Sequence, residues 1–148
     1  MAVSAHLYGL ATLAWLNKEV DWAADTIKVA LCTSTYTPDQ DAHDYFSDIT
    51  NEVSSSGTNY TAGGNAIGTP TAGYTAGTNV AKFSGNAVTF SAVTLTARYA
   101  IIYDSTPGTS ATNPLIAYVD FGADVSPVAG DLVITWNAAG IFTLTVAA

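Results

Sequence analysis

Positively charged side chains are scarce in this sequence. Lys and Arg together number 4 against 12 Asp and Glu, the formal net charge is −8, and the stretch after Arg98 contains neither Lys nor Arg. Nucleic-acid binding requires basic side chains that displace counterions from phosphates, and anionic lipid surfaces require charge of the same sign. The composition therefore excludes nucleic acid and membrane surfaces as partners. It favours a partner surface that is neutral or basic.

Cysteine is limited to Cys32, so the chain cannot form an internal disulfide. Cys32 stands in the apolar run 29–32, which favours a small buried side chain over a reactive thiol. This cysteine usage is typical of synthesis in the cytoplasm.

A long hydrophobic run is also missing. The apolar stretch at residues 7–16 has about half of the ~20 residues that a membrane-spanning helix needs. No Lys or Arg precedes it, so it lacks the basic segment that opens a secretory signal peptide. We therefore expect neither a membrane anchor nor export through a signal peptide.

Sequence patterns that carry catalysis or cofactor binding are absent. The two histidines, His6 and His43, are not near a Gly-x-Ser-x-Gly motif, because the chain contains none. No glycine-rich phosphate loop follows a strand and opens a helix. The carboxylates after residue 100 lie at or near turns, where Asp is common for structural reasons. We therefore expect a protein that is not an enzyme and that holds no cofactor.

The strongest candidate for a metal site is an acidic run between residues 39 and 52. An EF-hand loop beginning at Asp39 would need Gly at its sixth position and Glu at its twelfth, but these positions hold Asp44 and Thr50. A solvated acidic face is therefore favoured over a Ca²⁺ site, and no metal is expected. The carboxylates concerned are Asp39, Asp41, Asp44, Asp48 and Glu52.

Short stretches of period-two alternation are the main structural signal. The expected strands are residues 26–33, 80–84, 87–91, 93–103, 115–121, 132–136 and 142–146, the last two joined as a hairpin around residues 137–140. Within them, Trp136 is expected in the core. Apolar residues 7, 10, 11 and 14 recur at helical spacing, which predicts a helix over about residues 5–17.

These elements predict a mainly β fold, an antiparallel β-sandwich or barrel-like domain with one N-terminal helix. A chain of 148 residues is the size of one domain, so residues 1–148 are expected to form a single β-rich domain. A chain of this length buries enough surface to support a core.

The least regular segment is a Gly- and Thr-rich stretch at about residues 54–79, which we expect to be a flexible excursion. Tyr60 and Tyr74 each begin a copy of Tyr-Thr-Ala-Gly within it. Both are candidate interface residues, because exposed tyrosines suit a protein interface or stacking against a sugar. The other interpretation is that the excursion packs on its own sheet.

Six segments, in order along the chain, form a distinctive set. They are DTIKVALCT at 25–33, YTPDQDAHD at 36–44, NEV at 51–53, YTAGG at 60–64, ARYA at 97–100 and PLIAYVDFG at 114–122. Through them the chain resembles a group of small virion structural proteins of tailed bacteriophages, which are similar to capsid decoration (cement) proteins. The resemblance covers nearly the whole chain and is weakest over residues 66–92. No catalytic residue belongs to the group's pattern.

The resemblance implies a protein that is made in the host cytoplasm and binds the exterior of the phage head. Its implied partners are the major capsid protein and further copies of itself, often as a homotrimer at local three-fold positions, and its implied role is to stabilise the shell. The residues leave one alternative open, a carbohydrate-binding or adhesion module on a tail or fibre. Tyr60, Tyr74 and the Thr- and Asn-rich excursion are its basis.

Overall fold

The centre of the fold consists of strands with apolar side chains on both faces. In the computed structural model, which describes residues 2–147, these strands are β2 (Ile27–Cys32), β7 (Ala97–Asp104) and β8 (Leu115–Val125). Five of the six residues of β2 are buried. A strand buried on both faces needs a covering layer on each side, and these layers define the rest of the domain.

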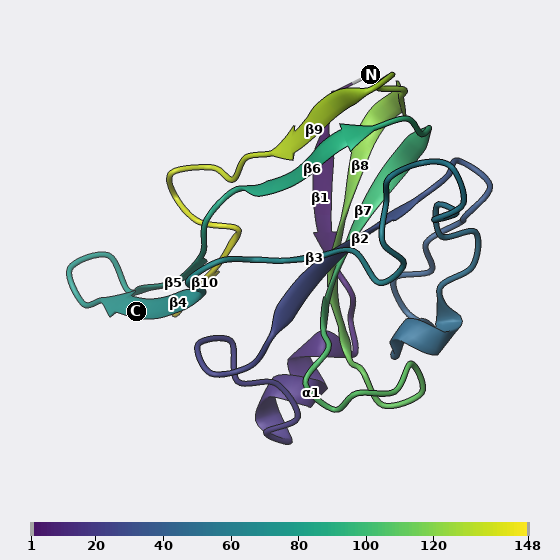
Figure 1. Cartoon of the computed structure of the whole chain (residues 1–148). Coiled ribbons are helices and arrows are strands. Elements are labelled where there is room, and N and C mark those ends of the chain that lie inside the picture. The colour runs from purple at the N-terminus through teal and green to yellow at the C-terminus, as the bar shows by residue number, and fades with distance from the viewer. Residues whose placement is uncertain (1, 148) are drawn as a thin grey trace.

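The central strands belong to a five-stranded antiparallel sheet with the order β1-β8-β7-β2-β3 (Figure 1). Its edge strands are β1 (Ser4–Leu7) and β3 (Asn65–Ala66). The pairs join segments far apart in the chain, since Ile27 lies opposite Asp104 and Ser4 opposite Asp120.

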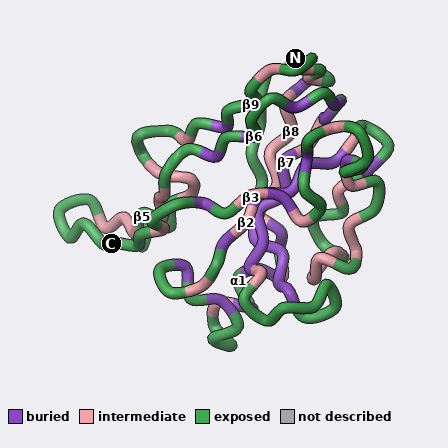
Figure 2. The backbone as a smooth tube through the Cα atoms, in the orientation of Figure 1, coloured by how far each residue is buried: buried purple, intermediate pink, exposed green. Residues whose placement is uncertain are grey.

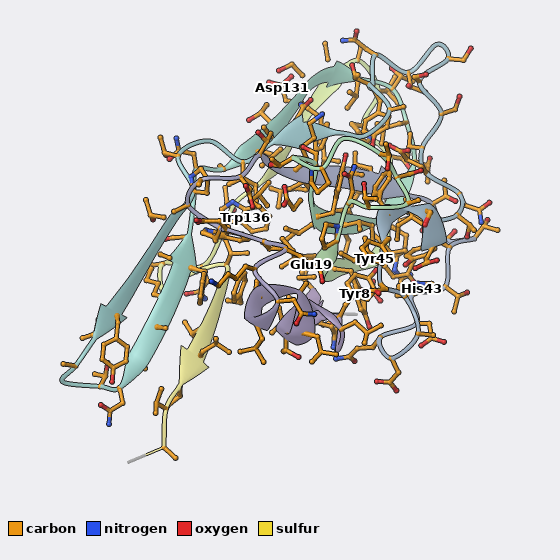
Figure 3. The ribbon with its side chains drawn as sticks, turned by 90° about the horizontal axis from the view of Figure 1, so that it is seen from below. Tyr8, Glu19, His43, Tyr45, Asp131 and Trp136 are labelled. Carbon is orange, nitrogen blue, oxygen red and sulfur yellow. The ribbon has the colours of Figure 1, made fainter. Side chains whose placement is uncertain are left out.

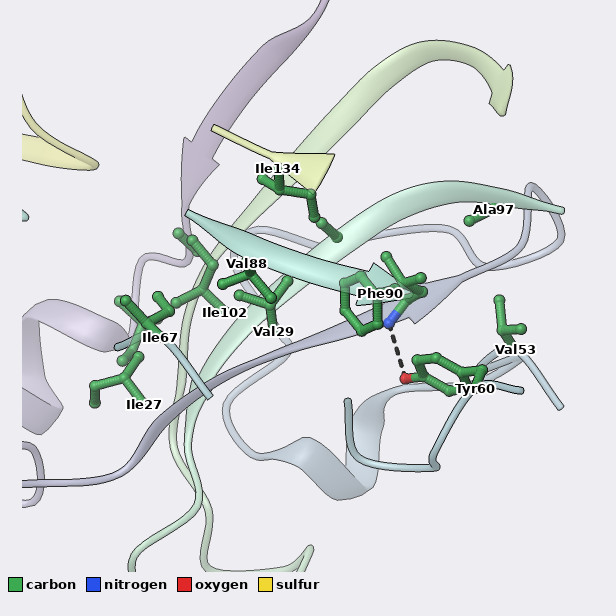
Figure 4. Close-up of a cluster of buried hydrophobic side chains, with 14 of the residues drawn as sticks. Ile27, Val29, Val53, Tyr60, Ile67, Val88, Phe90, Ala97, Ile102 and Ile134 are labelled. Atoms are coloured by element: carbon green, nitrogen blue, oxygen red, sulfur yellow. Dashed lines mark hydrogen bonds between the residues drawn. The ribbon is translucent and has the colours of Figure 1, made fainter. Parts of the chain in front are cut away.

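One face of this sheet is covered by the antiparallel pair β6 (Val88–Val93) and β9 (Gly130–Ile134). Val88, Phe90 and Ile134 from this pair pack on Val29 and Ile102 of the central strands (Figure 4). Two antiparallel layers enclosing an apolar middle form a sandwich-like arrangement. The mainly β, antiparallel fold class expected from the sequence is thereby confirmed.

The opposite face is covered by α1 (Ala11–Leu16), by a 3₁₀ helix at Phe46–Asp48 and by loops. Tyr8 and Tyr36 pack there on Ile101 and Tyr103 of β7. Cys32 is buried in the same cluster, which confirms the burial expected for this side chain. Within residues 2–147, no helix is long and apolar enough to cross a membrane.

A third sheet, of order β10-β5-β4, projects away from the two packed layers (Figure 1). It consists of β4 (Thr71–Thr75), β5 (Val80–Ser84) and β10 (Phe142–Thr145). We call residues 71–84 and 142–145 the arm. The Val146 N–H, just after β10, donates to the Asn79 carbonyl at the tip of the arm at 2.9 Å.

Three local expectations from the sequence are wrong. Residues 5–17 are not one helix, because Ser4–Leu7 pairs with β8 as strand β1 and α1 begins only at Ala11. Strands β9 and β10 do not form a hairpin, because β9 pairs with β6 and β10 with β5. Residues 93–103 are not one strand, because β6 ends at Val93 and β7 begins at Ala97. In each case distant pairing overrides the local pattern.

Two further expectations, on Trp136 and on residues 54–79, are met only in part. Trp136 is only partly buried and packs at the margin of the core, where its Nε1–H donates to the Asn86 carbonyl at 2.8 Å. The excursion at residues 54–79 contains more regular structure than expected, because it includes β3 and β4, which belong to two different sheets.

Candidate assembly surface

The arm is the most exposed sheet of the molecule (Figure 2). All five residues of β4 are exposed. The turn between β4 and β5 ends at Asn79, whose φ of 55° lies in the left-handed region that Asn tolerates better than most residues. The Tyr74 hydroxyl donates to Oδ1 of Asn79 at 3.0 Å and ties the tip of the arm together.

The surface of the arm is nearly uncharged. Lys82 is its only charged residue, and the Lys82 Nζ donates to the Ala138 carbonyl at 2.7 Å. Tyr74 is 58% exposed and Leu144 is 40% exposed. Removing uncharged apolar and hydroxyl side chains from water costs little free energy, so this surface is suited to contact with another protein.

An aromatic cluster holds the base of the arm on the body of the domain. The rings of Phe83 and Phe142 stack with centroids 4.5 Å apart, and Trp15 stacks on Phe142 at 5.1 Å. Trp22 meets Phe142 edge-on at 5.0 Å and donates its Nε1–H to the Ser84 carbonyl at 3.0 Å. Each such ring pair adds about 0.5–1.5 kcal/mol beyond the buried area. The cluster therefore fixes the direction in which the arm projects.

A groove of about 550 Å³ lies between the large sheet and β9. Its walls include Val3 and Phe121 on one side and Leu132, Trp136 and Ile141 on the other, and no lining residue is charged. Among the strands of residues 2–147, β1 pairs only with β8 and β9 only with β6. Each of these two strands therefore contributes a free edge, which can accept a further strand.

The charges nearest the groove point away from it. Asp120 alternates with Val119 and Phe121 along β8, so its side chain lies on the opposite face of the sheet. There the Arg98 guanidinium donates to the Asp120 carboxylate through Nε at 2.5 Å and Nη2 at 3.1 Å. This pairing lowers the pKa of Asp120. The groove thus remains an uncharged, mostly apolar surface.

The structure separates the two tyrosines predicted as interface residues. Tyr74 lies exposed on the arm. Tyr60 is only 3% exposed and belongs to the core, so the expectation that it serves as a surface contact is wrong. Its hydroxyl accepts a hydrogen bond from the Leu31 N–H at 3.0 Å, which is the dashed line at Tyr60 in Figure 4. The loop packs on its own sheet at Tyr60.

The histidines take structural positions. Nδ1 of His43 lies 2.8 Å from the Tyr36 hydroxyl, which lies 2.9 Å from the Tyr8 hydroxyl beneath α1 (Figure 3). Burial raises the pKa of Tyr36 to about 12, so its hydroxyl stays protonated. His6 is exposed on β1 and stacks on Tyr118. These contacts give both rings a packing role.

The acidic run between residues 39 and 52 supplies local hydrogen-bond acceptors. The Asp39 carboxylate accepts from the N–H groups of residues 41 and 42, and the Asp48 carboxylate accepts from those of residues 44 and 45, which lowers the pKa of Asp48. The Tyr45 hydroxyl donates to Glu19 Oε2 at 3.3 Å, and both residues are labelled in Figure 3. In the described part of the chain, no three His, Cys, Asp or Glu side chains are placed to hold a metal ion.

The chain matches no protein-family model, no curated protein and no solved structure. Sequence reasoning missed the groove, because its walls bring β1, near the start of the chain, together with β8 and β9 from the last third of the chain. The arm carries one usable signal. Residues 53–81 contain no charged side chain, which is unusual for an exposed segment.

Proposed function

We propose that the chain is a structural protein of a tailed-phage virion, a capsid decoration protein that binds the head exterior as a homo-oligomer and stabilises the shell. The observation that carries the proposal is the arm, a sheet whose outer strand is fully exposed and which bears a single charge. A sheet that adds little to its own core gains stability by docking on a partner. The resemblance of the sequence to small phage virion proteins supports the same role.

Such a role depends on a weak contact that many copies of the protein make with the same shell. A weak contact made by each subunit of an oligomer gains about 10²–10⁴ in avidity when several subunits bind the same shell. A protein that binds only the assembled shell then stabilises it by mass action. The partners proposed are the major capsid protein and further copies of this chain, as a trimer.

The test is a binding experiment with heads of the encoding phage prepared without this protein. The wild-type chain is expected to co-sediment with the heads and raise their melting temperature, whereas Tyr74→Asp on the arm weakens both effects. Val128→Asp is the matched control, since Val128 is 79% exposed and lies outside the arm. Absence of the wild-type protein from the head surface in an electron cryomicroscopy reconstruction would overturn the proposal.

A second function has one observation in its favour. Tyr74 and its neighbours Thr71, Thr75, Lys82 and Ser84 line a shallow hollow of about 300 Å³ on the arm. An exposed aromatic ring bordered by hydroxyls suits a sugar, which would make the chain a carbohydrate-binding module on a tail or fibre. Glycan-array binding that is lost in Tyr74→Ala would support this alternative, and absence of binding across the array would remove it.

A further inference from the structure

We propose that the groove between β1 and β9 receives the arm of a second copy of this chain, so that copies join head to tail. The inference rests on the proposed function, because it names the surfaces through which the homo-oligomer forms. It joins the two surfaces of the molecule that lack a partner: an uncharged projection and an uncharged groove.

The groove suits a partner that presents the edge strand of a sheet. It is flanked by the free edge of β1 and the free edge of β9, whose N–H and C=O groups can pair with an added strand. Val3 on its wall is 66% exposed, and Ala5 beside it is exposed as well. An added strand would satisfy the backbone edges and cover these side chains together.

The distribution of charged residues favours the arm of another copy as the occupant of the groove. Because Lys82 contributes +1 to the net charge of −8, the chain outside the arm carries −9. A contact between two such bodies brings carboxylates together, whereas a contact between the arm and the uncharged groove buries no carboxylate. Its outer strands, β4 and β10, also have free edges among the described strands.

A contact between two different surfaces has a geometric consequence. Each copy offers one arm and one groove, so every copy can give its arm to one neighbour and receive an arm from another. Such heterologous contacts close into a ring when the rotation between copies permits it. A trimer is one closed form of this arrangement.

The test is native mass spectrometry of the full chain, with one variant for each surface. The wild type is expected at a multiple of 15.3 kDa. Leu144→Asp on the arm and Val3→Asp on the groove are each expected at 15.3 kDa. An equimolar mixture of the two variants is expected to form 1:1 dimers and nothing larger, because the intact arm of one fits the intact groove of the other.

Three controls keep this experiment decisive. Val128→Asp, on a third surface, is expected to keep the wild-type mass. Circular dichroism checks that each variant is folded, and Tyr74→Asp on the arm and Ala5→Asp on the groove replace any variant that is not. A monomeric wild type, or variants that keep the wild-type mass, would overturn the inference. A monomer that still binds phage heads would overturn it while leaving the proposed function intact.

Discussion

The hydroxyl of Tyr60 donates a hydrogen bond to Oε1 of Glu52 at 2.7 Å, and Glu52 also accepts from the N–H of Gly63. The ring of Tyr60 lies against Phe90, with centroids 5.7 Å apart. One side chain thereby connects the loop after β2, the loop before β3 and the covering strand β6. Burial raises the pKa of Tyr60, so the hydroxyl remains a donor at every physiological pH.

Replacement of Tyr60 by Phe is expected to lower the free energy of unfolding by about 1–3 kcal/mol, because the buried Leu31 N–H loses its acceptor. Urea denaturation measures the change. Tyr74→Phe is the matched control, since its hydroxyl bonds only at the exposed arm tip, and a change within about 0.5 kcal/mol is expected. Equal losses in the two variants would contradict the role assigned to Tyr60.

Gly57 and Gly64 have similar backbone angles, so alanine substitutions at the two positions distinguish the cost of backbone strain from the cost of steric overlap. Gly57 has φ of 72° and Gly64 has φ of 69°. A Cβ at Gly57 meets open space, whereas a Cβ at Gly64 overlaps the carbonyl of Val29 in the central strand β2. We expect Gly57→Ala to cost about 1–2 kcal/mol from the left-handed angle alone. Gly64→Ala should cost at least about 4 kcal/mol or prevent folding, as measured by thermal unfolding.

Asp104 gives the stability a definite dependence on pH. Its side chain is 1% exposed, Oδ1 accepts from the Thr106 N–H at 2.8 Å, and Oδ2 has no hydrogen-bond partner within residues 2–147. Burial, with a further contribution from Asp25, raises its pKa. The folded state therefore holds this proton more tightly than the unfolded state. The contribution of Asp104 to stability falls as the pH rises from the unfolded pKa of about 3.9 through the raised folded pKa.

Asp104→Asn removes this titration and keeps the oxygen that accepts from Thr106. The difference in unfolding free energy between variant and wild type is expected to shift in favour of the variant as the pH rises from about 4 to about 8. Asp48 and Asp120, whose pKa values are lowered, destabilise both proteins at acidic pH and cancel in this difference. A difference that is constant with pH would show that Asp104 does not titrate in this range.

Cys32 is expected to resist thiol reagents in the folded protein. Burial raises the pKa of its thiol to about 12, so that only about 10⁻⁴ of it is ionised at pH 8. Labelling by a chromogenic disulfide should follow the rate of unfolding in native buffer and be complete within mixing time in guanidinium. Rapid labelling of the folded chain would place Cys32 at the surface.

Trp136 and Trp22 each donate an indole N–H to a carbonyl but differ in burial. Trp22 is 3% exposed at the base of the arm, whereas Trp136 is partly exposed on the groove wall. Trp22→Ala should cost about 3–5 kcal/mol and Trp136→Ala clearly less, about 1–3 kcal/mol, in chemical denaturation. The reverse order would assign Trp136 to the core.

The positions of strands that show period-two alternation within their own residues could be predicted from the sequence. Residues 80–84 coincide with β5, and residues 26–33 contain β2 with one extra residue at each end. Strand partners could not be predicted, because alternation at β9 and β10 is the same whether they pair with each other or with β6 and β5.

Of the two candidate interface residues, one position could be predicted from the sequence and the other could not. The exposure of Tyr74 follows from its uncharged, glycine-flanked surroundings. The burial of Tyr60 depends on Glu52, Leu31 and Phe90, which meet it only in the folded chain. The periodicity of apolar residues carries no information on which distant residues come into contact.

The pairing of β1 with β8 and of β2 with β7 sets the order in which the protein can be made. On the ribosome, β2 first meets the two-residue strand β3, but its longer neighbour β7 and the only neighbour of β1 emerge with residues 97–125. We therefore expect the five-stranded sheet to form only late in translation. Folding should be slow for a domain of this size, since the pairs β1–β8, β2–β7 and β10–β5 each close a long loop.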